Sequence, residues 1–175
     1  MMKHRIILVT GGARSGKTVL AERLARHHSG GETPVYIATA QPHDAEMGAR
    51  IAAHRRDRGA DWRTIEAPLD LPAALAASEG AGARLIDCLT LWLSNALPDA
   101  ADLDGLRAAL AAAQAPVVLV TNELGQGIVP DNALARRFRD DHGRMNQAVA
   151  TLADQVWLAV AGQPLRLKPP IVDFP

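Results

Sequence analysis

The sequence has little cysteine, no excess of charge and no long hydrophobic run. Cys88 is the only cysteine among 175 residues, which excludes an internal disulfide and predicts a reducing compartment, the cytoplasm. The formal net charge is +0, so there is no general attraction to nucleic acid or to an anionic membrane. Apolar runs such as "RIILVT" fall far short of the ~20 residues that cross a bilayer. We therefore expect a soluble protein that inserts into no membrane and binds no nucleic acid.

The overall composition is that of an ordinary globular protein. Hydrophobic residues make up 48% of the chain and charged residues 22%. The chain of 175 residues fits one domain with a sizeable core. Because no internal repeat and no linker divides it, we expect a single domain over residues 1–175.

Short apolar strands alternate with amphipathic helices along the chain. We expect strands at 5–10, 34–39, 62–67, 84–88, 116–121 and 155–160. We expect helices near 17–28, 44–58, 70–79, 89–97, 102–114 and 131–153. The strands are apolar almost throughout rather than alternating, which indicates a sheet that is covered on both faces. The predicted fold is a three-layer α/β domain with a mostly parallel central sheet flanked by helices.

The last predicted helix has a regular apolar pattern. Its apolar residues recur at spacings of 3, 4 and 7, which predicts one buried stripe made of Leu134, Phe138, Met145, Val149 and Leu152. Gly143 interrupts this helix at a cost of ~1 kcal/mol relative to alanine.

The clearest motif is "VTGGARSGKT" at residues 9–18, which has the spacing of a phosphate-binding loop. A predicted strand precedes it and a helix follows, so a chance glycine-rich turn is the weaker interpretation. Glycines let backbone N–H groups converge on phosphate oxygens. Lys17 would reach the β and γ phosphates, and the Thr18 hydroxyl would ligate Mg²⁺. The predicted nucleoside triphosphate contacts are Gly11, Gly12, Ala13, Arg14, Ser15, Gly16, Lys17 and Thr18.

Two carboxylates follow predicted strands. Asp87, in "ARLIDCLTLW", would hold Mg²⁺ or its water at the carboxyl edge of the sheet. Alternatively, it caps the helix that follows. Glu123 ends the next strand, and there a loop-bracing or capping role is as plausible as a catalytic one. Cys88 is expected to be a small buried residue.

His54 lies in the predicted helix 44–58. By helical spacing it shares a stripe with Met47, Ile51 and Arg58, and a histidine on such a stripe is usually a hydrogen-bonded core residue. A role as a metal ligand lacks a second histidine or cysteine at suitable spacing. His43 is too differently placed to form a pair with it.

The arginines around His54 point to a different role. Arg50 and Arg58 lie four residues to either side of it, and Arg55 and Arg56 follow it directly. Cations so close favour the neutral ring, and a neutral ring nitrogen is a nucleophile. The same arginines would hold the oxygens of a phosphate under attack.

Three further segments together carry a family resemblance: "EMGARIAAHR", "DCLTLWLSN" and "GIVPDNALARRFRD" with the following "GRMNQ". With the phosphate loop they make the sequence resemble, over nearly its whole length, the bifunctional adenosylcobinamide kinase/adenosylcobinamide-phosphate guanylyltransferases of cobalamin biosynthesis. The resemblance implies two reactions of a corrinoid substrate. Its aminopropanol hydroxyl is phosphorylated by ATP or GTP, and GMP is then transferred from GTP through a covalent histidine intermediate, with release of pyrophosphate.

The resemblance also implies roles for particular residues. His54 falls on the histidine that carries GMP, and Lys17 serves catalysis from the phosphate loop. Further nucleotide contacts would be Ala38, Thr39, Ala40, Arg55, Arg56, Asp57, Arg58, Glu66 and Asp87. Position 87 is a glutamate in other members, so either carboxylate can serve. Family members assemble as homotrimers, and residues 169–175 form a C-terminal tail beyond their usual end.

Two alternatives use the same loop. A P-loop small-molecule kinase with one activity would need Asp87 and Mg²⁺ but has no use for His54. A nucleotide-dependent regulatory switch would need a partner surface and would transfer nothing to a corrinoid.

Overall fold

The apolar segments of the sequence form one sheet, which the computed structural model describes over residues 5–97 and 99–169. In this part of the chain the sheet has seven strands in the order β3-β2-β4-β5-β1-β6-β7. The strands are β1 (Ile6–Gly11), β2 (Val35–Ala38), β3 (Arg63–Glu66), β4 (Arg84–Asp87), β5 (Val117–Val120), β6 (Gln155–Val160) and β7 (Gln163–Lys168). The strands β1 to β6 pair in parallel, and β7 runs antiparallel to β6.

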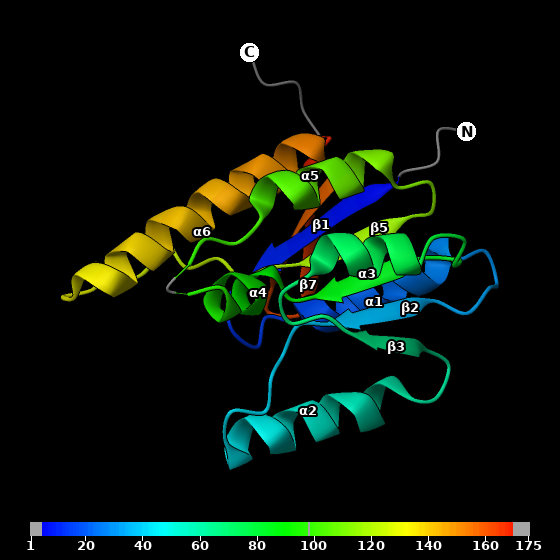
Figure 1. Ribbon diagram of the computed structural model, residues 1–175, viewed down its shortest axis with the longest axis horizontal. Coiled ribbons are helices and arrows are strands. Elements are labelled where there is room, and N and C mark those ends of the chain that lie inside the picture. The colour runs from blue at the N-terminus through cyan, green and yellow to red at the C-terminus, as the bar shows by residue number, and fades with distance from the viewer. Residues whose placement is uncertain (1–4, 98, 170–175) are drawn as a thin grey trace.

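Helices cover both faces of this sheet (Figure 1). They are α1 (Lys17–His28), α2 (Ala45–Arg58), α3 (Leu71–Ala77), α4 (Leu89–Asn95), α5 (Leu103–Ala112) and α6 (Ala133–Leu152). Alternate residues of a strand face opposite sides. Thus Leu8 of β1 packs in the core with α3 to α6, while Ile7 and Val9 pack with α1. The three-layer α/β fold expected from the sequence is confirmed.

The expected strands and helices are present, with ends that differ by at most two residues. The strand β7 was not expected. The predicted tail begins at Pro169, directly after β7, and the rest of it lies outside the described residues. No helix among residues 5–97 and 99–169 is long and apolar enough to cross a membrane.

The apolar stripe predicted for α6 is buried over only part of its length. Met145 and Val149 are buried, but Phe138 is half-buried and Leu134 is 60% exposed. The first half of α6 extends beyond the sheet, so it has no sheet to pack on (Figure 1). Gly143 does not break the helix, which runs without interruption across it.

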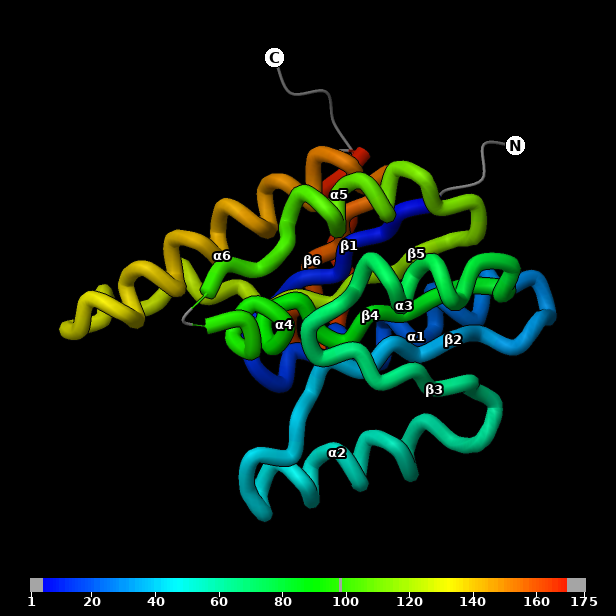
Figure 2. The backbone as a smooth tube through the Cα atoms, in the orientation of Figure 1, coloured from blue at the N-terminus to red at the C-terminus, as the bar shows by residue number. Residues whose placement is uncertain are grey.

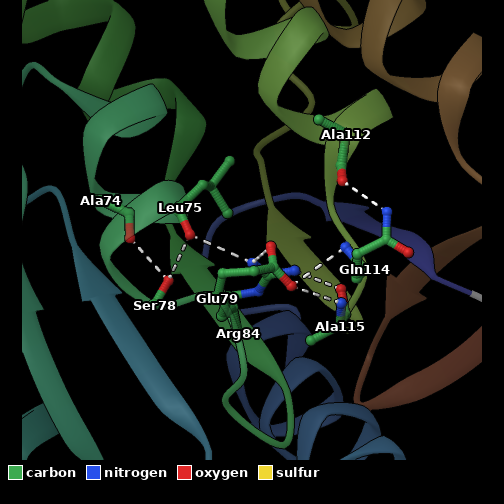
Figure 3. Close-up of polar contacts among 8 residues, drawn as sticks. All are labelled: Ala74, Leu75, Ser78, Glu79, Arg84, Ala112, Gln114 and Ala115. Carbon is green, nitrogen blue, oxygen red and sulfur yellow. Dashed lines mark hydrogen bonds and ion pairs between the residues drawn. The ribbon is translucent and has the colours of Figure 1, made fainter.

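A buried arginine holds the amino-terminal edge of the sheet together (Figure 3). The Arg84 side chain, at the start of β4, is fully buried. Its guanidinium donates to the Leu75 carbonyl at 3.3 Å, to Glu79 Oε2 at 2.8 Å and to the Ala115 carbonyl. Glu79 Oε1 also accepts from the amides of Gln114 and Ala115. These contacts join α3 to the connection between α5 and β5.

The helix α2 is an insertion between two neighbouring parallel strands. The chain leaves β2, forms α2 and returns as β3, so α2 lies beside β3 (Figure 2), and a hydrogen bond from Arg26 to the Arg58 carbonyl joins its last turn to α1. Asp44 starts the helix, because its side chain accepts a hydrogen bond from the Met47 amide at 2.7 Å. This arrangement brings His54 to the edge of the sheet.

Candidate active site

The carboxyl ends of the parallel strands meet at one edge of the sheet. Ala38 pairs with Glu66 on one side and with Asp87 on the other, and Asp87 pairs with Val120. The strand β1 ends next to them at Gly11, where the phosphate loop begins. Parallel sheets place their ligand sites at this edge.

Two glycines of the loop have no room for a side chain. Gly11 has a φ of 155°, and a Cβ there would lie 2.5 Å from the Ala159 carbonyl oxygen. Gly16 has a φ of 92°, and its Cβ would lie 3.1 Å from Gly162 Cα, in the turn between β6 and β7. The Gly162 amide also donates to the Ser15 carbonyl at 3.0 Å. The β6–β7 turn therefore supports the loop from behind.

The loop leads directly into α1, which begins at Lys17. Amide groups at the start of a helix attract phosphate. Lys17 Nζ donates to the Gly12 carbonyl at 2.8 Å, across the loop. Burial lowers the pKa of Lys17; the negative charge of Asp87 opposes this shift and the positive charge of Arg50 adds to it. The lysine is thus held in a partly desolvated, charged site.

One pocket joins the loop to α2. Lys17 and Thr18 line it from the loop side, His54 from α2, and Asp87 from the end of β4. The other lining residues are Tyr36, Ala38, Ala40, Met47, Arg50, Ile51, Arg55, Arg58, Glu66, Cys88, Leu91 and Asn122. Nine of the eighteen site residues predicted from the sequence line this pocket, whereas residues 11–16, Thr39, Arg56 and Asp57 do not.

The His54 ring is half-buried in this pocket, and no hydrogen bond joins it to another described residue. A packed core histidine would be expected to have such a partner. Arg50 also lines the pocket, and no hydrogen bond or ion pair joins it to another described residue. An imidazole and a guanidinium that lack such partners in one pocket are better placed to bind a reacting phosphate than to stabilise a core.

Of the charged residues that follow His54 in α2, Arg55 and Arg58 line the pocket, and Arg56 and Asp57 do not. The Arg55 guanidinium forms an ion pair with Glu66, and both line the pocket. Arg58 is buried at the end of the helix. Arg56 and Asp57 are exposed and lie outside this pocket.

The Asp87 carboxylate does not cap the following helix. The residue at the cap of α4 is Cys88, and no side chain there accepts a capping bond. Asp87 Oδ2 instead accepts a hydrogen bond from the Tyr36 hydroxyl at 2.6 Å. Thr39 is fully buried, and its hydroxyl is bonded to the backbone of Cys88. As predicted, Cys88 is buried; burial raises the pKa of its thiol to about 11.

Glu123 takes the bracing role that was its alternative. Its Oε1 accepts from the Gly125 amide at 3.2 Å, and it does not line the pocket. Its neighbour Asn122, which the sequence did not single out, does line the pocket. The Asn122 amide and Nδ2 both donate to the Thr90 hydroxyl, at 3.0 and 3.1 Å.

Glu22, which the sequence did not single out, lies within electrostatic reach of this site but does not line the pocket. This carboxylate lies on α1, where burial raises its pKa and the charges of Arg58, Asp87 and His54 act on it. A signal was present in the sequence, because Glu22 follows Thr18 by four residues and so shares its helix face.

These features define a class of protein: a nucleotide-binding α/β enzyme with a phosphate loop and a carboxylate at the sheet edge. A solved structure has the same fold, the flagellar accessory protein FlaH from Methanocaldococcus jannaschii. It is 15% identical, with a TM-score of 0.53, over 95% of this chain and 79% of that one. At this identity the likeness concerns the fold alone.

Sequence comparison identifies the family. Residues 7–167 match the family described as cobinamide kinase / cobinamide phosphate guanyltransferase. The bifunctional adenosylcobalamin biosynthesis protein CobP of Pseudomonas aeruginosa is 50% identical, over 92% of this chain and 96% of its own length. The protein CobU of Salmonella typhimurium, described in the same words, is 44% identical, over 93% of this chain and 99% of its own. The chain therefore belongs to the cobinamide kinase/cobinamide phosphate guanyltransferase family, as its motifs predicted.

Proposed function

We propose that this single pocket binds the nucleotide for both reactions named by the family. In the first, ATP or GTP phosphorylates the aminopropanol hydroxyl of adenosylcobinamide. In the second, GMP from GTP is joined to the resulting phosphate, giving adenosylcobinamide-GDP and pyrophosphate. One observation carries the proposal: Lys17 of the phosphate loop and His54 of α2 line the same pocket.

The kinase step needs positioning and charge rather than a protein nucleophile. The loop amides and Lys17 would hold the β and γ phosphates, and the corrinoid hydroxyl would attack the γ phosphorus and lose its proton to solvent. The bond from that phosphorus to the β–γ bridging oxygen breaks, and the nucleoside diphosphate leaves. Lys17 is placed to stabilise the charge that develops on the departing oxygen.

The guanylyl step uses His54. A neutral ring nitrogen attacks the α phosphorus of GTP, a P–N bond forms, and the bond to the α–β bridging oxygen breaks to release pyrophosphate. A phosphate oxygen of adenosylcobinamide phosphate then attacks the same phosphorus and breaks the P–N bond. Arg50 and Arg55 line the pocket beside His54 and would bind the phosphate oxygens during both transfers.

Thr18 and Asp87 would hold Mg²⁺. Both line the pocket, and Asp87 Oδ1 has no hydrogen bond to another described residue. Within residues 5–97 and 99–169 no group of three or more His, Cys, Asp or Glu side chains is arranged to hold a metal ion. This fits Mg²⁺, which is usually held by one or two protein oxygens together with the phosphates of its substrate. When bound, the ion would neutralise phosphate charge.

The structure limits how three of the remaining predicted nucleotide contacts, Thr39, Arg56 and Asp57, could act. The Thr39 side chain is committed to the Cys88 backbone, so a nucleotide contact there would come from its main chain. Arg56 and Asp57 lie outside the pocket, so they would act only on a part of the substrate that extends beyond it. A homotrimer and a cytoplasmic location follow from the resemblance and from the single cysteine. Light scattering of the purified protein measures the first.

The decisive experiment is incubation with GTP labelled at the α phosphorus, followed by denaturing electrophoresis. The wild-type protein should retain label, and GTP labelled at the γ phosphorus should leave none. A P–N bond is broken in acid, where the protonated imidazole is a good leaving group, and persists in alkali. The label should therefore be lost in acid and kept in base.

Two histidine variants locate the label. His54→Ala should abolish it while kinase activity continues. His43→Ala is the matched control, because His43 is exposed and lies outside the pocket, and it should label like the wild type. Acid-stable label, or full labelling of His54→Ala, would show that His54 does not carry GMP.

A further inference from the structure

We propose that Tyr36 is a positioning residue that links the helix of His54 to the carboxylate of Asp87. Its hydroxyl orients Asp87, and its ring holds the end of α2 against the sheet. This inference rests on the proposed role of Asp87 in binding Mg²⁺, and it goes beyond that role because it assigns Tyr36 an action through Asp87 and Arg58.

The Tyr36 hydroxyl is bonded to Asp87. It lies 2.6 Å from Asp87 Oδ2, the distance of a strong O–H···O⁻ hydrogen bond. A tyrosine hydroxyl has one proton to donate and a carboxylate oxygen can only accept, so the hydrogen bond runs from Tyr36 to Asp87. One carboxylate oxygen is therefore occupied and the carboxylate plane is fixed. The other oxygen, Oδ1, keeps its lone pairs for a ligand.

The register of the sheet explains why these two residues meet. Tyr36 on β2 lies directly beside Leu85 on β4, two positions before Asp87. Side chains two positions apart on a strand project from the same face. Tyr36 and Asp87 therefore share a face, and the long tyrosine side chain reaches diagonally to the end of the next strand.

The Tyr36 ring contacts the last residue of α2. The Arg58 guanidinium carbon lies 3.5 Å from the centre of the Tyr36 ring, in a buried cation–π contact. Trp62 packs edge-on against the same ring, with centroids 6.0 Å apart. Arg26 of α1 lies over Trp62 and donates to the Arg58 carbonyl at 3.1 Å. The last turn of α2 is thus clamped between α1 and the Tyr36 ring.

This clamp acts on His54 through the helix. Arg58 is the last residue of α2 and lies four residues after His54, so the two share one face of the helix. Holding Arg58 fixes the direction in which His54 enters the pocket. Group transfer is sensitive to misplacement of about 1 Å. Contact of Tyr36 with both α2 and Asp87 would keep the nucleophile His54 and the carboxylate of Asp87 at a fixed distance from each other.

Tyr36→Phe and Tyr36→Leu separate the two contacts, because both lack the hydroxyl but only phenylalanine keeps the ring. The first measurement is the affinity for a non-hydrolysable GTP analogue by calorimetry, with and without Mg²⁺. In Tyr36→Phe the gain in affinity from Mg²⁺ should fall by roughly 10- to 100-fold, the usual cost of losing a residue that orients a metal ligand. Affinity without Mg²⁺ should change far less, because phenylalanine keeps the ring that lines the pocket.

The second measurement is the rate of His54 labelling at saturating Mg²⁺. Tyr36→Phe should label within about twofold of the wild type, since its ring still supports Arg58, whereas Tyr36→Leu should label roughly tenfold or more slowly. Circular dichroism establishes that each variant is folded. Equal labelling by the two folded variants would overturn the role of the ring. If the leucine variant does not fold, Tyr36→Phe still decides the role of the hydroxyl.

Asp87→Asn tests the premise separately. Asp87→Asn should lose the gain in nucleotide affinity that Mg²⁺ gives. The double variant of Asp87→Asn with Tyr36→Phe should lose no more of this affinity, because Tyr36 acts through Asp87. If Asp87→Asn loses the gain while Tyr36→Phe keeps it in full, the proposed function stands and the role of the Tyr36 hydroxyl is wrong. If Asp87→Asn also keeps the gain, the assignment of Mg²⁺ to Asp87 is itself wrong.

Discussion

The Nε2 atom of His142 lies 2.9 Å from the hydroxyl oxygen of Thr90, inside the protein. That hydroxyl already accepts two hydrogen bonds from Asn122, one from its amide and one from its side chain. Both lone pairs are then in use, so the hydroxyl proton is directed to His142. The Thr121 hydroxyl lies 3.3 Å from the same nitrogen and donates its own proton to Asn146 Oδ1. A residue of α6 thereby sets the orientation of Asn122 in the pocket.

Protein stability should depend on the protonation of His142. Burial lowers the pKa of this ring, and the charge of Glu123 only partly opposes the shift. The unfolded chain therefore takes up the proton more readily. The free energy of unfolding should be highest above pH ~6.5 and should decrease as the pH falls below that value.

The variant His142→Gln keeps an acceptor for Thr90 but cannot titrate. Urea unfolding at a series of pH values between about 5 and 7 should show a flatter pH dependence for it than for the wild type. An identical slope in the two proteins would mean that His142 is not the group responsible.

The Thr90 hydroxyl should affect catalysis through Asn122. Thr90→Val has nearly the same shape but leaves the two Asn122 donors without their acceptor, so kcat/KM should fall by about tenfold. Thr90→Ser keeps the hydroxyl and should retain activity close to that of the wild type. Steady-state kinetics of both reactions make the comparison. Full activity of Thr90→Val would contradict the role of the hydroxyl, and a loss confined to Thr90→Ser would point to the methyl group instead.

Lys17→Ala should abolish both reactions, with a loss of at least about 100-fold in each, because both require the triphosphate in the loop. The fold should survive, since the lysine bonds only to the Gly12 carbonyl. Lys168→Ala is the control, because that ammonium contacts the carbonyls of Ala150 and Thr151, away from the pocket. Normal turnover by folded Lys17→Ala protein would contradict the site.

The Arg84 cluster should contribute to stability and not to activity, because it lies at the opposite end of β4 from Asp87. Arg84→Met leaves the Leu75 and Ala115 carbonyls without this donor and should lower the free energy of unfolding by about 1–3 kcal/mol, because the third partner, Glu79, is exposed enough to bond to water. Chemical denaturation measures this, and unchanged stability would show that the cluster is dispensable.

Glu79 gives the same cluster a pH dependence. Burial alone would raise its pKa, but the hydrogen bonds from Arg84 and from the amides of Ala115 and Gln114 outweigh burial and lower it. Its contribution is therefore complete above its ordinary pKa, near 4.5, and is lost as the pH falls through the lowered value. In Glu79→Gln the free energy of unfolding should therefore decrease less steeply as the pH falls below about 4.5.

Much of the fold could be predicted because the strands β1 and β5 are almost wholly apolar and the helices between strands are long and periodic. The strand β7 was missed because "QPLRLK" contains a proline and two cations, and only its pairing with β6 makes it a strand. The exposure of Leu134 was missed for a related reason: periodicity shows which face of α6 is apolar but not how far the sheet beneath it extends.

The phosphate loop and the residues at strand ends could be found from local order alone, since parallel strands bring their carboxyl ends together. The contact between Tyr36 and Asp87 could not. These residues are 51 positions apart, and their meeting depends on β2 pairing with β4 and on the register of that pair. Asn122 and Glu123 show the same limit, because two adjacent polar residues follow one strand and only the folded chain decides which of them lines the pocket.

The turn between β6 and β7 has a consequence for how the protein is made. It packs behind the phosphate loop through Gly162, while β6 pairs with β1, so both supports of the loop come from late in the sequence. On the ribosome, residues 11–18 emerge long before residues 155–168 are synthesised. We therefore expect the nascent chain to hold no nucleotide while it grows, and nucleotide to stabilise the protein only once this hairpin has closed.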